Sequence, residues 1–148
     1  MRFSLPFVAI AALVGLASAT PTLETRQEAV RFGIVSLDPT SVKLGQKFTV
    51  NYNSTLARWQ PINLDVYISG KYPSGFVTAS YQLLRSDYPA DAHFYSFETT
   101  LPVISNDDTD GYVANGSYIV TAFITYQTET GAISRGGVEA PIAIDLSS

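Results

Sequence analysis

The sequence predicts an all-β fold, a single antiparallel β-sandwich of about seven short strands. From residue 30 onward, apolar and polar residues alternate with a period of two, which is typical of strands that bury one face. Turn residues interrupt the alternation, and no apolar stripe with helical spacing is long enough to indicate a helix. The chain has no cysteine, so a well-packed core has to outweigh the chain entropy without disulfides.

The N-terminal residues are predicted to lie outside the folded domain. Residues 1–19 combine Arg2, an apolar run and the small-residue ending ASA, which are the features of a secretory signal peptide. A membrane anchor is the alternative, but Pro6 interrupts the run and the remaining apolar stretch is short for a span. Residues 20–29 resemble the short polar leads of fungal secreted proteins, so we expect a flexible lead followed by one domain over residues 30–148.

Seven strands are expected in order along the domain, the first near the segment VRFGIVSL. Their inward-facing residues are expected to be Phe48, Val50 and Tyr52; then Ile62, Leu64, Val66 and Ile68; then Val77, Ala79, Tyr81 and Leu83. In the last three strands they are expected to be Tyr95, Phe97 and Leu101; then Tyr118, Val120, Ala122 and Ile124; then Val138, Ala140, Ile142, Ile144 and Leu146.

Turn and edge signals fit this arrangement. Asp38, Pro39 and Gly45 supply a crossing and a tight turn between the first two strands. The pair Gly136-Gly137 predicts a β-bulge in the last strand, and Pro141 predicts that this strand has a free edge, because proline has no N–H to donate.

Three segments resemble strands of immunoglobulin-like and fibronectin type III-like domains. They are IVSLDP at 34–39, GQKFTV at 45–50 and GSYIVTA at 116–122. The resemblance implies an Ig-like β-sandwich in which Tyr118 stands at the position of the tyrosine corner. The chain departs from the antibody pattern because it lacks a cysteine pair and because Trp59 precedes the expected third strand.

Charge and composition limit the classes of partner. The formal net charge is −4, and loss of Arg2 with the signal peptide would make it one unit more negative. Binding of nucleic acids and of anionic membranes rests on clustered Lys and Arg, so neither partner is expected. No cofactor is expected either.

The segment NDDTDGYVANGS at residues 106–117 partly matches a calcium loop. Asn106, Asp108, Asp110 and Gly111 fit the first ligand positions of an EF-hand loop and its turn glycine. Ser117 stands where the bidentate glutamate should be, and strands flank the segment. We therefore expect an acidic surface turn, with weak calcium binding as the alternative.

Two N-x-S/T sequons, at Asn53 and Asn115, are candidate N-glycosylation sites in a chain with a signal peptide.

The sequence offers no recognisable catalytic set. His93 is the only histidine, which rules out a metal site with several histidines, and no G-x-S-x-G elbow accompanies it. No catalytic residue is therefore assigned and the protein is expected not to be an enzyme. A small secreted hydrolase that uses surface carboxylates is the alternative.

An exposed aromatic sheet face is the candidate ligand-binding surface. The expected alternation turns Tyr67, Phe76, Phe123 and Asp65 away from the core, and Trp59 belongs to a second, weaker set in the loops. The sequence thus predicts a secreted extracellular protein that binds a carbohydrate or a protein. A structural component of a cell wall or matrix is a further alternative.

Overall fold

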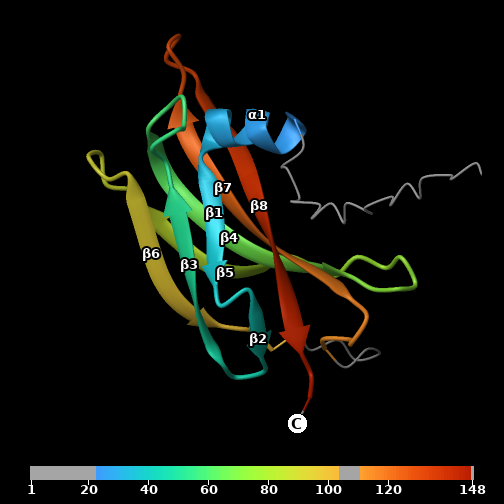
Figure 1. Ribbon diagram of the computed structural model, residues 1–148. Helices are drawn as coiled ribbons and strands as arrows, with labels where there is room; N and C mark the ends of the chain where they lie inside the picture. The colour runs from blue at the N-terminus through green and yellow to red at the C-terminus, as the bar shows by residue number, and fades with distance from the viewer. Residues whose placement is uncertain (1–22, 104–110, 148) are drawn as a thin grey trace, which may run out of the picture.

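Two β-sheets and one helix make up the part of the chain that the computed structural model describes, residues 23–103 and 111–147 (Figure 1). The elements are α1 (Leu23–Phe32), β1 (Ile34–Asp38), β2 (Ser41–Lys43), β3 (Lys47–Asn53), β4 (Pro61–Lys71), β5 (Tyr81–Asp87), β6 (Phe94–Thr100), β7 (Ser117–Gln127) and β8 (Ile133–Asp145). The predicted all-β class is therefore confirmed. The predicted signal peptide lies outside the described residues.

The strand arrangement differs from the predicted antiparallel sandwich of seven strands. One sheet has three strands in the order β1-β3-β6, and the other has five in the order β2-β8-β7-β4-β5. β2 runs parallel to β8, with Ser41 opposite Ala143, so the five-stranded sheet is mixed. The prediction missed β2 because this strand has three residues and only Val42 is buried, which is too short for a visible alternation.

The hydrophobic core is built from the facing sides of the two sheets. Its largest fully buried side chains come from β3, β4, β7 and β2 and include Tyr52, Phe48, Leu64, Ile68, Ile124 and Val42. Each fully buried aliphatic or aromatic side chain contributes roughly 1.5–3 kcal/mol. The expected inward residues of β3, β6 and β7 are confirmed, since each lies on the buried or half-buried side of its strand.

Four expected inward positions are wrong, because the structure exposes Ile62, Val77, Ala79 and Leu146. Ile62 is 42% exposed because the register of β4 shifts between Pro61 and Asn63, which buries Pro61 instead. In the segment before β5, Val77 is exposed while Thr78 is buried and exchanges hydrogen bonds with Gly70. A buried threonine whose hydroxyl accepts from a backbone N–H costs little to bury, and it inverts the alternation that the sequence suggested.

Helix α1 occupies most of the segment that was expected to be a flexible lead. Gly33 follows its last residue with a φ of 90° and its N–H donates to the carbonyl of Ala29, an arrangement that ends helices. The hydroxyl of Tyr52 donates to the carbonyl of Phe32 at 2.6 Å. The end of the helix is thus held by β3. This contact joins residues 20 positions apart, so no local sequence signal reveals it.

The glycine pair of β8 makes room for two aromatic rings and does not form the predicted bulge. The β7–β8 register runs without a shift through Gly136 and Gly137. A Cβ at Gly136 would overlap the ring of Phe32, and a Cβ at Gly137 would lie 2.9 Å from the ring of Phe123. Successive residues of a strand face opposite sides, so each glycine admits one ring on one side of the sheet.

Pro141 lies on β8 beside the free part of its edge. β2 pairs with β8 only from Ala143 to Asp145, and the rest of that edge has no strand partner in the described residues. The predicted free edge at Pro141 is therefore present, although β8 lies inside the strand order.

Candidate ligand-binding face on the five-stranded sheet

The side of the five-stranded sheet that faces away from the core carries a cluster of charged and aromatic side chains. Asp65 of β4 lies opposite Arg85 of β5 and opposite Phe123 of β7. The neighbours of Asp65 in the chain, Leu64 and Val66, are fully buried in the core, so Asp65 points outward by alternation. We call the residues Asp65, Tyr67, Arg85, Phe123 and Arg135 the outer-face site.

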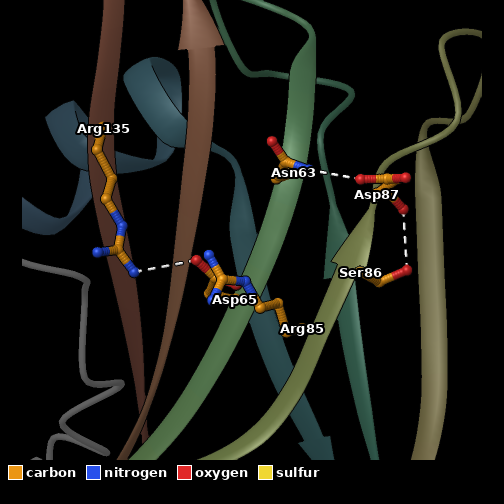
Figure 2. Close-up of polar contacts among 6 residues, drawn as sticks. All are labelled: Asn63, Asp65, Arg85, Ser86, Asp87 and Arg135. Carbon is orange, nitrogen blue, oxygen red and sulfur yellow. Dashed lines mark hydrogen bonds and ion pairs between the residues drawn. The ribbon is translucent and has the colours of Figure 1, made fainter.

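A single carboxylate holds two arginines at this site (Figure 2). An N–H of Arg135 donates to Oδ2 of Asp65 at 3.2 Å, and Nε of Arg85 lies 3.5 Å from Oδ1 of the same carboxylate. Asp65 is only 8% exposed, whereas the side chains of Arg135 and Arg85 are 49% and 77% exposed. Oδ1 has no hydrogen-bond partner within the described residues. The site therefore combines one shielded negative charge with two accessible positive charges.

An aromatic pair forms the apolar half of the site. The guanidinium of Arg135 lies over the ring of Phe123, 4.5 Å from its centroid, and the ring of Tyr67 meets Phe123 edge-on at 5.9 Å. Gly137 leaves the space beside Phe123, because any side chain there would press on the ring. The cation–π contact and the ion pair to Asp65 together fix the head of Arg135.

A second polar pair lies farther along β4 and β5, the strands that carry Asp65 and Arg85. The amide of Asn63 donates to Asp87 at 2.8 Å, and the hydroxyl of Ser86 donates to the carbonyl of Asp87 (Figure 2). The hydroxyl of Tyr95 donates to Ser86 at 3.1 Å, which connects β6 of the other sheet to β5. These contacts fix β5 and with it the backbone that carries Arg85.

The structure brings together three of the five predicted ligand-binding residues, namely Tyr67, Phe123 and Asp65. Phe76 lies in the turn after β4, 55% exposed and 5.9 Å from the ring of Tyr72, so it does not belong to the face. The expected strand at residues 76–83 was wrong in its first half, which explains the misplacement.

Trp59 lies at the end of the core and not on the outer face. Its ring stacks on Tyr126 at 4.7 Å, and the guanidinium of Arg58 covers it at 4.7 Å. Its indole nitrogen is buried with no hydrogen-bond partner within the described residues. These contacts give Trp59 a packing role.

Sequence reasoning missed both arginines of the site. Arg85 fell outside the expected fourth strand, which was thought to end at Leu83, whereas β5 runs to Asp87. Extending that strand with the expected alternation would have turned Arg85 inward, like Leu83. The register of β5 against β4 shifts between Gln82 and Leu84, which turns Arg85 outward, opposite Asp65. Arg135 precedes the glycine pair, where a bulge was expected in place of a regular strand.

The remaining predicted sites are the calcium-loop segment, His93 and the two sequons. Asn106, Asp108 and Asp110 lie outside the described residues, and the residues that are described contain no group of three or more His, Asp or Glu that could hold a metal. His93 is exposed just before β6. Asn115 is exposed in the turn before β7, while Asn53 is half-buried and its side-chain oxygen accepts from Thr55 N–H at 2.8 Å.

No membrane-spanning candidate was found among the helices of the described residues, since none has the length and apolar character that a span requires.

Comparisons with known proteins assign no family. No family model and no curated protein matches the chain. Among solved structures, the chain is similar to Pseudomonas fluorescens alkylpurine DNA glycosylase AlkC bound to DNA containing an abasic site analog, with 17% identity and a TM-score of 0.36. The match covers 72% of this chain and 29% of that one, so the chain spans less than a third of its length.

These findings correct three predictions. The structure found is a DNA glycosylase, so the comparisons do not support the resemblance to immunoglobulin-like and fibronectin type III-like domains. Its bound partner is DNA, so the prediction of an extracellular carbohydrate or protein ligand is withdrawn, and so is the exclusion of nucleic acid. A TM-score of 0.36 is too low to carry a function from that protein to this one. The chain therefore remains without an assigned family.

Proposed function

We propose that this chain is a non-enzymatic binding module and that the outer-face site takes a planar aromatic ligand that carries an anionic group. The observation that carries the proposal is the shared carboxylate of Asp65, which holds Arg85 and Arg135 beside the ring of Phe123. A nucleotide, which joins a flat base to a phosphate, is the biological ligand class that combines both features.

The charges of the site favour an anion. Asp65 compensates one of the two arginines, which leaves a local excess of one positive charge. A guanidinium has five N–H donors, and Arg135 uses one of them on Asp65. The remaining donors are half-exposed and are held in place, so an anion can bind without a large loss of side-chain entropy.

The rings of the site favour a flat ligand. Tyr67 and Phe123 are half-buried and meet edge to face, which leaves a rigid apolar surface beside the guanidinium of Arg135. Stacking of a base on an aromatic side chain is worth about 1–3 kcal/mol as judged by alanine substitution. A purely ionic contact is opposed by the net charge of −4 of the whole chain, so the aromatic half of the site has to contribute to binding.

The experiment titrates the ¹⁵N-labelled protein with adenosine 5′-monophosphate and, separately, with its two halves, adenosine and inorganic phosphate. We expect shifts at residues of the outer-face site with the whole nucleotide and much weaker ones with either half. Arg135→Gln and Phe123→Leu should each weaken binding several-fold. A single-stranded oligonucleotide in the same titration distinguishes a free nucleotide from a strand as the source of the ligand.

Arg58→Gln is the matched control. Arg58 also lies over an aromatic ring, that of Trp59 at 4.7 Å, and also pairs with a carboxylate, that of Glu129 at 3.1 Å. Its contacts are with Val30 of α1, Trp59 and Glu129, none of which belongs to the outer-face site. Equal loss of binding in Arg58→Gln and Arg135→Gln, or no shift at the site with any probe, would refute the proposal.

We also propose that the chain is secreted, with cleavage of residues 1–19. The support is the sequence pattern of these residues. Expression of the full chain in a eukaryotic host and N-terminal sequencing of the protein from the medium test it, with Thr20 as the expected first residue.

A further inference from the structure

A cavity of about 340 Å³ lies where α1, β1 and β8 meet, and it shares no residue with the outer-face site. Its apolar wall includes Ile34 of β1, Ile119 of β7, and Val138 and Pro141 of β8. A volume of this size is at the lower end of the range of small-molecule sites, which are typically apolar with a few placed polar groups.

The helix wall of this cavity is fixed. Gly33 lines it, and a Cβ at this position would lie 2.5 Å from the carbonyl oxygen of Asn53, so the chain passes too close to β3 for any other residue. The hydrogen bond from Tyr52 to the carbonyl of Phe32 holds the same turn. The cavity is therefore formed before a ligand arrives, which lowers the entropy cost of binding.

The polar groups of the cavity carry one sign of charge. Glu28 of α1 and Glu139 of β8 both line it, and no lysine or arginine does. Neither glutamate takes part in an ion pair with another described residue. Two carboxylates beside an apolar wall complement a ligand that has an apolar body and a positive charge.

The spacing of the strands decides between a compact ligand and an extended peptide. Cα atoms of β1 and β8 approach within 8 Å of each other. A strand inserted between them would need roughly 9–10 Å, because paired strands lie about 4.7–4.9 Å apart. The gap is too narrow for a peptide that pairs with both edges.

We propose that this cavity binds a small amphipathic cation, with its ammonium group between Glu28 and Glu139 and its apolar part against Ile34 and Val138. The proposal is independent of the outer-face site, because the two sites share no side chain and favour ligands of opposite charge.

The test uses three probes of equal chain length: n-hexylammonium, n-hexanol and hexanoate. Each is titrated into the ¹⁵N-labelled protein, and the amides of Ala29, Val35 and Val138 report binding in the cavity. We expect saturable shifts with hexylammonium, weaker shifts with hexanol and none with hexanoate.

Variants separate the contribution of the two carboxylate charges to binding from that of the cavity volume. Glu28→Gln and Glu139→Gln should each weaken hexylammonium binding about two- to fivefold, the range of partly exposed charge pairs. Ala29→Leu should block the cavity while all charges stay. Asp91→Asn removes an exposed carboxylate elsewhere and should change nothing.

Three outcomes would overturn the inference: hexanoate that binds as tightly as hexylammonium, an Asp91→Asn effect equal to that of Glu139→Gln, or no shift at the cavity amides with any probe.

Discussion

Replacing Asp65 by alanine should lower the free energy of unfolding by about 1–2 kcal/mol, because it removes the carboxylate that two arginines share. The arginines are half-exposed or more, so water takes over part of the solvation that the carboxylate supplied. The loss should therefore stay below the 3–5 kcal/mol typical when a fully buried pair is broken.

The two arginines should contribute unequally. Arg135 donates a hydrogen bond at 3.2 Å and is also held over Phe123, so its coupling to Asp65 should be about 1 kcal/mol. Arg85 lies at 3.5 Å without a hydrogen bond and is 77% exposed, so its coupling should be below about 0.5 kcal/mol. The ranking follows from geometry and exposure and does not depend on the absolute values.

Urea unfolding of the single and double alanine variants measures both couplings by double-mutant cycles. Glu129→Ala is the control, since the ion pair of Glu129 with Arg58 is exposed on both sides and should contribute little. A coupling of Arg85 equal to that of Arg135 would contradict the reasoning. An increase in stability in Asp65→Ala would show that desolvation of the carboxylate outweighs both ion pairs.

Three further expectations follow from single positions. Gly137→Ala should cost about 1 kcal/mol and move Phe123, since the new Cβ would lie 2.9 Å from its ring; unchanged ring-current shifts around Phe123 would contradict this. In a eukaryotic secretory host, Asn115→Gln should remove a glycan mass and Asn53→Gln none, because only Asn115 is exposed; mass spectrometry of the two variants decides. Burial raises the pKa of Tyr52 above its ordinary value of 10.0, so the stability it confers is complete below pH about 10 and falls as pH rises further; Tyr52→Phe should make the loss measured by alkaline urea titration shallower.

The sequence correctly predicted those strands that keep one side in the core and turn the other side outward along their whole length. β7 lies between β4 and β8, and its inner residues Val120, Ala122 and Ile124 alternate with half-buried or polar positions. Such a strand cannot slip by one residue without exposing its core side, so the pattern in the chain matches the pattern in space.

The failures occurred where distant contacts decide the local structure. α1 has no strong apolar stripe, and Phe32 is accommodated by Gly136, more than a hundred positions along the chain. Thr78 is buried because its hydroxyl accepts from Gly70, which the spacing of apolar residues does not reveal. The periodicity of apolar residues along the chain cannot reveal either contact.

The candidate site was predicted only in part, because some of its residues lie on regular alternating strands and others depend on contacts between distant segments. Alternation along β4 and β7 placed Asp65, Tyr67 and Phe123 on one side, and the strand pairing then brought them together. The arginines depend on the true end of β5 and on the regular register of β8 at its glycines, and both were misjudged.

The two glycines of β8 also constrain how this chain can change in evolution. A larger residue at position 136 requires a smaller ring at Phe32, and a larger residue at 137 requires a change at Phe123. The first exchange would loosen the helix at the wall of the cavity, and the second would alter the outer-face site. The residues at positions 136 and 137 would thus covary with two separate segments, one on each side of the same sheet. Each of the two proposed sites could then change without disturbing the other.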